Sequence, residues 1–278
     1  MTLAGFAALQ LLGRPGEPIR PILLARKERL PVSGMFGVYV LERIFDFASM
    51  AVIAVVALLA FHPNTHNNET ARALGRTAKP AALLLIAALI GLASFLFYFR
   101  LHGTSLLERQ LQGWLKAHGW RASLANISLG FVRGVQTIHG WRDLTLAVTY
   151  SAAHWFLVLV IYFWVAQSFG GALGILTLLD AMLVLSFTLV GSLIQLPGVG
   201  GGSQALSTIA YTKIFLVKPE AALAASIVLW LITFAGCSIA GVPLLLREGL
   251  SLGKLREMAE HEKETVAGSE APQGELPR

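Results

Sequence analysis

Long apolar runs separated by short polar segments make up most of the chain. The runs that are long enough to cross a bilayer cover residues 33–61, 80–99, 144–168, 172–194 and 219–246. Each holds at least the roughly 20 helical residues that a hydrocarbon core of about 30 Å requires. A shorter apolar run, residues 205–217, would complete a sixth crossing with help from the loop before it. The pattern predicts an all-α polytopic membrane protein with about six transmembrane helices.

Two motifs rich in glycine and proline interrupt this pattern. Residues 13–21 have the sequence GRPGEPIRP, and residues 195–204 have the sequence QLPGVGGGSQ. Neither continues a regular helix easily, because proline lacks an N–H donor and glycine loses more conformational entropy there. Two broken, re-entrant motifs, one in each half of the chain, indicate a transport site near the midplane, and an inverted repeat would relate them. The alternative is that each motif is a tight loop between helices.

The composition indicates a membrane protein rather than a nucleic-acid-binding one. Hydrophobic residues make up 55% of the chain and charged residues 14%, against about 25% charged in soluble domains. The formal net charge is +6, but Lys and Arg gather at the ends of apolar runs, where they set membrane topology. We therefore expect residues 14–31 and 100–143 to be cytoplasmic and residues 62–79 to form an external loop. Residues 248–278 are expected to be a disordered cytoplasmic tail, too polar to bury a core.

The first full span carries three ionisable residues in its first half. Glu42 and Asp46 share a helix face, whereas Arg43 is turned away from Glu42 by about 100°. Ionisable groups within a span are costly, and they usually face a cavity or a partner. The alternative is a helix foot at headgroup level, where these charges pair with one another or with the region around Arg20.

The candidate binding site combines these charges with the two broken motifs. If Ser203 opens the next helix, the N–H groups of residues 201–204 would face a cavity and attract a lipid phosphate. Arginines of the first motif suit bidentate phosphate contact, with a glutamate holding one of them. The predicted substrate-binding residues are Arg14, Glu17, Arg20, Glu42, Arg43, Asp46, Gln195, Gly198, Gly200, Gly201, Gly202, Ser203 and Gln204.

The sequence contains no arrangement of residues that predicts an enzyme. The histidines are scattered, and the single cysteine, Cys237, rules out a disulfide and a metal site built from several cysteines. The glycine run of the second motif lacks the lysine of a nucleotide-phosphate loop. We therefore expect no catalytic residues, no metal and no cofactor.

Three sequences in the chain resemble one known family. GRPGEPIRPILLARKE, then VLERIFD, then QLPGVGGGSQ are similar in type and order to motifs of the lysylphosphatidylglycerol synthase transmembrane-region family. This flippase-like family includes the membrane half of the bacterial multiple peptide resistance factor. The resemblance covers residues 1–247. It implies an inner-membrane domain with inverted helical hairpins that moves lipids or lipid-linked molecules between leaflets.

The chain departs from the family pattern in two places. Family members usually have one or two further spans before the first motif, so we expect residues 1–247 to lack those spans. The second motif often has glutamate where this chain has Gln204, which removes a proton or cation partner. Lysyl transfer in the family belongs to a separate soluble domain that the sequence does not contain.

Two functions remain open from the sequence. The first is a translocase for an anionic phospholipid or a polyprenyl-phosphate-linked substrate, in a bacterial inner membrane, with the C-terminus cytoplasmic. The second is a non-transporting membrane anchor or regulatory partner of a glycosyltransferase or another cell-envelope enzyme. The basic residues of segment 100–143 would then be the docking surface. Neither function involves nucleic acid.

Overall fold

The computed structural model describes residues 32–62, 68–102, 141–196 and 200–236, besides four isolated positions. The chain forms two compact units. One of them, Arg43–Phe95 with Gly140–Ala240, holds most of the described residues. The architecture below is that of this unit. The first broken motif, segment 103–140 and the tail 248–278 lie outside the described residues.

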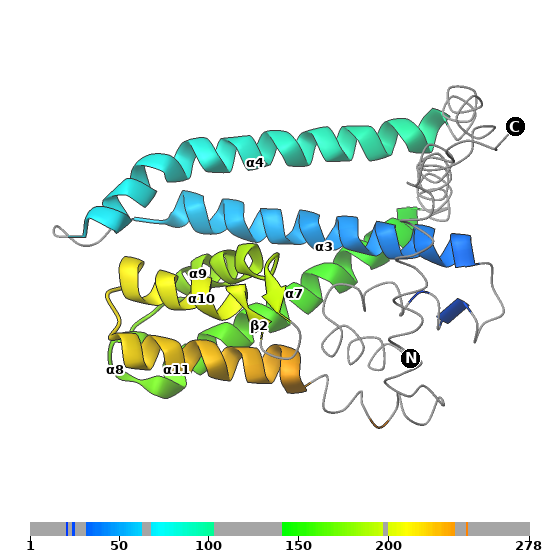
Figure 1. Ribbon diagram of the computed structural model, residues 1–278. Helices are drawn as coiled ribbons and strands as arrows, with labels where there is room; N and C mark the ends of the chain where they lie inside the picture. Colours follow the sequence, from blue (N-terminus) through cyan, green and yellow to red (C-terminus); the bar gives the residue numbers. More distant parts are fainter. Residues whose placement is uncertain are drawn as a thin grey trace, which may run out of the picture. The chain divides into compact units, whose positions relative to one another are not determined.

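Three described helices are long and apolar enough to cross a membrane (Figure 1). They are α3 (Val32–Ala60), α4 (Glu69–His102) and α7 (Trp141–Phe169). Their positions confirm the spans predicted over 33–61, 80–99 and 144–168. The protein is therefore an all-α membrane protein, and its described residues include one short antiparallel pairing of two residues per strand.

Helix α4 begins earlier than the sequence suggested. It starts at Glu69 and contains Pro80 in its interior, so the prediction of a loop over residues 62–79 before a helix over 80–99 is wrong. The structural reason is Asn68, whose Oδ1 accepts from the N–H of Ala71 at 3.0 Å. The carbonyl of Asn68 accepts the first helical hydrogen bond, from Arg72. This N-cap lets a polar stretch fold as the first turns of the helix.

The run predicted as a span over 172–194 is broken near its start. Gly170 and Gly171 have φ of 64° and 54°, a region that residues with a side chain rarely adopt. After the four-residue helix α8 (Gly171–Gly174), Thr177 forms a capping box with Asp180 and opens α9 (Leu178–Gly191). Asp180 is thus a capping residue, and the prediction of a single long helix here is wrong.

A hairpin of two short helices follows. Helix α9 turns back through β1 (Gln195–Leu196) and β2 (Gly200–Gly201) into α10 (Gly202–Ile209), which continues as the π-helix η2 (Ala210–Ile214). The first arm has 14 residues and the second has eight α-helical plus five π-helical residues. At 1.5 Å per residue each arm is about 20 Å long, which is too short to span a core of about 30 Å.

The last described helix completes the packing around the hairpin. Helix α11 (Pro219–Trp230) starts at proline, as predicted, and continues as the π-helix η3 (Leu231–Ala235). Helix α10 packs on both α9 and α11, and α7 packs on α9 and α11. The core is apolar and close-packed; its largest members include Trp155, Leu159, Tyr162, Leu183, Leu185, Tyr211 and Leu229.

One buried amide fastens the hairpin to α4. Both Nδ2 hydrogens of Asn68 are donated to the end of η2, to the carbonyl oxygens of Lys213 at 2.8 Å and Ile214 at 3.0 Å. A helix end leaves such carbonyls without helical partners, and Asn68, only 5% exposed, supplies them. One side chain therefore caps the start of α4 and the end of the hairpin together.

Replacing Asn68 tests this double role. Asn68→Ala removes a cap and two hydrogen bonds, so we expect the free energy of unfolding to fall by about 2–3 kcal/mol. Asn68→Asp keeps the cap acceptor but turns a carboxylate toward two carbonyl oxygens, and we expect it to lose at least as much. Unfolding by SDS in mixed micelles measures both variants. An Asn68→Asp protein as stable as the wild type would show that the contact with the hairpin contributes nothing.

Candidate functional site

Backbone hydrogen bonds close the turn between the two arms of the hairpin. The N–H of Ile194 donates to Gly191 at 3.0 Å, and the carbonyl of Ile194 accepts from Gly202 at 3.0 Å. Beyond them, Gln195 pairs with Gly201 and Leu196 with Gly200 in antiparallel register. These bonds give the non-helical backbone internal partners, which a membrane interior requires.

The two arms meet backbone to backbone where the turn begins and ends. A Cβ on Gly191 would lie 2.2 Å from the carbonyl oxygen of Gly202, and one on Gly202 would lie 2.3 Å from that of Gly191. No side chain fits at either position. The glycine motif predicted a break in the helix. Gly191, four residues before the motif, was missed, because a single glycine in an apolar run does not indicate which backbone it contacts.

The predicted anion site at the start of α10 needs correction at one position. We expected the N–H groups of residues 201–204 to face a cavity, but the N–H of Gly202 is donated to Ile194 within the turn. The helix begins at Gly202, one residue before Ser203, and no side chain caps it. Ser203 is buried, and its hydroxyl donates to Oε1 of Gln204 at 3.1 Å.

Small hydroxyl side chains line the interfaces of the hairpin. Thr208 of α10 and Ser226 of α11 share a hydrogen bond of 3.0 Å between their hydroxyls. The hydroxyls of Ser207 and Thr188 donate to backbone carbonyls one turn earlier, at 2.9 and 2.8 Å. Such residues let membrane helices approach closely while their polar groups stay bonded. These hydroxyls therefore serve packing rather than ligand binding.

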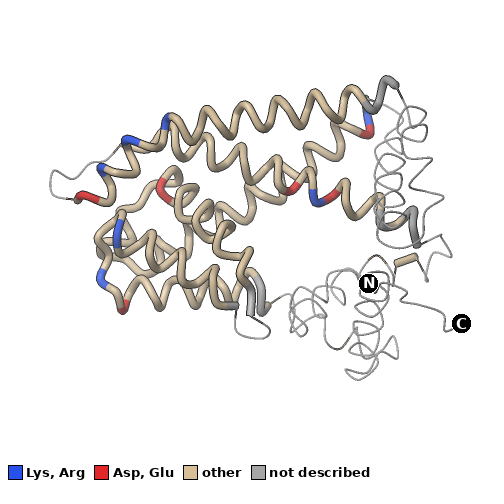
Figure 2. Tube along the Cα trace, turned by 45° about the horizontal axis from the view of Figure 1, so that its top comes forward, with Lys and Arg blue, Asp and Glu red and all other residues tan. Residues whose placement is uncertain are grey.

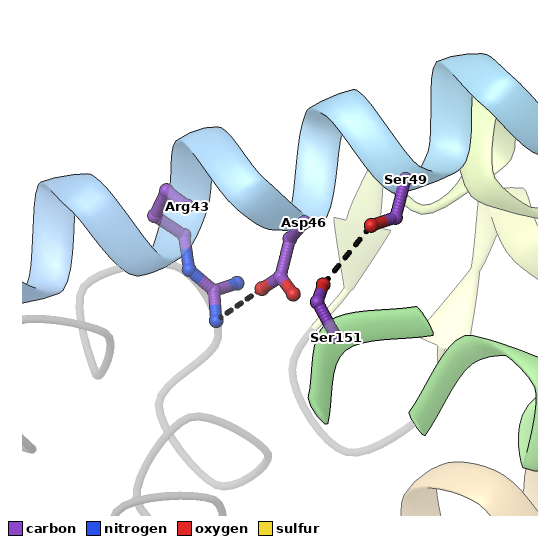
Figure 3. A network of polar contacts seen from close by, with 4 residues as sticks. All are labelled: Arg43, Asp46, Ser49 and Ser151. Carbon is purple, nitrogen blue, oxygen red and sulfur yellow. Dashed lines mark hydrogen bonds and ion pairs between the residues drawn. The ribbon is translucent and has the colours of Figure 1, made fainter. Parts of the chain in front are cut away.

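A row of polar side chains follows α3 toward α7 (Figure 3). Nη2 of Arg43 lies 2.9 Å from Oδ2 of Asp46, and the two side chains are 33% and 19% exposed. One turn further, the hydroxyl of Ser49 lies 3.0 Å from that of Ser151 on α7. Arg43 and Asp46 therefore pair with each other, which is one of the pairings that the sequence left open for these charges. The serine pair was missed, because 102 residues separate its members.

The remaining predicted site residues are only partly described. Glu42 is half-buried on α3. The structure gives Gln195 and Gly200 as backbone in β1 and β2, and it gives Gly201 a φ of 89°. The other predicted positions, Arg14, Glu17, Arg20 and Gly198, lie outside the described residues.

The row on α3 offers charge and hydroxyls for binding. A guanidinium held by a carboxylate is suited to bidentate contact with a phosphate. Among the described residues no group of three or more His, Cys, Asp or Glu side chains could hold a metal ion. Arg43, Asp46 and the two serines can together recognise a polar or anionic group.

The long apolar helices and the broken hairpin define a multi-pass membrane protein. The sequence profile of the lysylphosphatidylglycerol synthase transmembrane region matches residues 1–241. The chain therefore belongs to this family, which confirms the resemblance seen in the motifs. No curated protein and no solved structure matches the chain.

Replacing the crossing glycines tests the geometry of the turn. Gly191→Ala and Gly202→Ala each add a methyl group that clashes with a backbone carbonyl of the opposite arm. We therefore expect the free energy of unfolding to fall by about 2–3 kcal/mol. Gly91→Ala is the matched control, because its Cβ would meet nothing within 4 Å. SDS unfolding in mixed micelles compares the three variants. Equal stability of all three would contradict the close approach of the arms.

Proposed function

We propose that the protein moves lipids or lipid-linked molecules between the leaflets of a bacterial inner membrane. The observation that carries this proposal is the α9–α10 hairpin, in which two sub-span helices join through non-helical backbone. At membrane depth such backbone is tolerated only inside protein or beside a water-filled cavity. Transporters build their substrate sites from broken helices of this kind. Membership of a membrane-domain family named for a lipid synthase supports a lipid substrate.

The outer ends of the hairpin support a re-entrant path. In the last turn of α7, Nε2 of Gln167 donates to the carbonyl of Leu176, just before α9 starts. Asn68, just before α4, holds the end of η2. The end of α7 and the start of α4 lie at the same end of the unit (Figure 1). These contacts support a hairpin that enters and leaves at one face of the membrane, with its turn about 20 Å deeper.

The proposed site receives an anionic head group. The Arg43 guanidinium is the described cation best suited to a phosphate, and Asp46 holds it in place at 2.9 Å. Ser49 and Ser151 offer hydroxyls one turn further along. From the sequence, Arg14, Glu17 and Arg20 of the first motif and Gln204 of the second remain part of the proposal. The proposed function consists of binding and moving the lipid, with no covalent step.

Leaflet exchange in vesicles tests the proposal. The purified chain is reconstituted with fluorescent phosphatidylglycerol or a fluorescent polyprenyl phosphate, and dithionite quenches the lipid exposed outside. In vesicles with the wild-type protein, we expect dithionite to quench the fluorescent lipid of both leaflets, because lipid from the inner leaflet reaches the outer one. Arg43→Gln and Asp46→Asn should slow exchange at least about tenfold, because loss of one well-placed charged contact costs about 1.5–3 kcal/mol. Glu17→Ala and Arg20→Ala extend the test to the first motif.

Arg142→Gln is the matched control, since Arg142 is an exposed charge at the start of α7. It should exchange lipids as the wild type does, and every variant must keep the unfolding midpoint of the wild type. Normal exchange by both Arg43→Gln and Asp46→Asn would reject the site. No exchange by folded wild-type protein would reject the translocase and favour a membrane anchor or regulatory partner of an envelope enzyme.

A further inference from the structure

The first turns of α4 carry a basic stripe. Arg72, Arg76 and Lys79 follow one another at spacings of four and three residues, which places them within about 60° of each other around the helix. All three side chains are exposed. The helix cannot easily rotate them inward, because Ala71 and Ala78, each one residue before a member of the stripe, are 2% exposed.

The stripe lies at the edge of the apolar span. From Pro80 through residue 99 the chain has twenty residues without a charged side chain. As a helix this length covers about 30 Å, the thickness of the hydrocarbon core. The three basic residues directly before it are therefore at headgroup depth, with stems that can lie along apolar surface and charges that reach the polar layer.

The outgoing end of the hairpin adds two further cations to the same end. Lys213 and Lys218 are exposed, and they flank the link from η2 to α11. The backbone of Lys213 is held by Asn68, which lies only four residues before Arg72. Figure 2 shows blue positions on α4 and on the hairpin at this end, with the apolar helices extending away from it. We call Arg72, Arg76, Lys79, Lys213 and Lys218 the basic surface.

The basic surface has an uncompensated charge. Glu69, Asp180 and Glu220 are the acidic residues of the helix starts at this end, which leaves a net charge of +2. The carboxylate of Asp180 accepts from the N–H and the hydroxyl of Thr177 at 2.8 and 2.7 Å, within its own capping box. Within the described part of the chain, no ion pair joins any of the five cations to an acid.

We propose that the basic surface binds the phosphates of anionic phospholipids in the leaflet at this end of the protein. Unpaired Arg and Lys side chains at headgroup depth meet a layer of phosphates, and each contributes about 1 kcal/mol to attraction by anionic lipid. Bound anionic lipids would surround the end of the hairpin where α9 starts and η2 ends. The surface is separate from the Arg43–Asp46 pair, and the inference does not depend on lipid translocation.

Lipid binding by the full chain tests this surface. The protein in neutral detergent is titrated with fluorescent phosphatidylglycerol and with phosphatidylcholine of the same chains, read by anisotropy. At low salt we expect the wild type to prefer phosphatidylglycerol at least about tenfold. The triple variant Arg72→Gln/Arg76→Gln/Lys79→Gln should lose most of that preference, since each charge contributes about fivefold.

Two control variants separate charge from structure. Glu69→Gln lies on the same turns of α4 but removes an opposing charge, so it should keep or raise the preference. Arg142→Gln should keep it, because Arg142 is an exposed charge at the start of α7 and belongs to neither proposed site. A triple variant that retains the wild-type preference, or a wild type without any preference, would overturn the proposal. Release of the lipid by millimolar inorganic phosphate would assign the surface to free phosphate instead.

Discussion

The close approach of Gly191 and Gly202 is the constraint on which the rest of the described unit depends. In a bilayer, apolar side chains gain little by leaving lipid for protein, so close packing and hydrogen bonds must hold helices together. Two glycines let the arms of the hairpin touch through their backbones. The turn then satisfies its own polar groups through Ile194 and the short β-pairing. With these bonds made, a helix pair that stops short of the far surface can exist inside a membrane.

The end of the hairpin opposite the turn is held by side-chain hydrogen bonds instead. There the second arm ends in the π-helix η2, and Asn68 binds the carbonyls at its end. The same amide starts α4 and so sets where the basic residues of that helix begin. The buried side chain of Asn68 therefore fixes the end of the hairpin against the first turns of α4, which carry the basic residues. We had expected this end to be external, and its net positive charge of +2 weighs against that orientation under the positive-inside rule.

The sequence predicted the parts of the fold that depend on composition alone. Helices α3 and α7 follow from the length of their apolar runs, and Pro219 marked the start of α11. The polar first turns of α4 could not be predicted, because their cap acts together with residues about 145 positions away. The turn at Gly170 and Gly171 lies between the two predicted spans, but we missed the second break, before α9, whose local signal is the Thr177–Asp180 capping box. Apolar character extended across that break and hid it.

The candidate site was predictable where its residues are close in sequence. Arg43 and Asp46 are three positions apart, which is enough to suggest a pair on a helix. The glycine-rich motif showed where the helix breaks. The contact between Gly191 and Gly202 and the hydrogen bond between Ser49 and Ser151 could not be predicted, because both depend on how the helices pack. The N–H of Gly202 was assigned to a ligand because the sequence could not reveal its partner, the carbonyl of Ile194.

The depth of the hairpin turn is the most direct test of this account. Leu193 and Lys218 are both exposed, and each is replaced by cysteine in a Cys237→Ser chain and labelled with a fluorophore. Vesicles then carry nitroxide quenchers either on the headgroup or along the acyl chain. We expect acyl-chain quenchers to act most strongly on the label at 193 and headgroup quenchers on the label at 218. Equal quenching of both labels by headgroup nitroxide would mean that the turn reaches the far surface, and the re-entrant hairpin would be wrong.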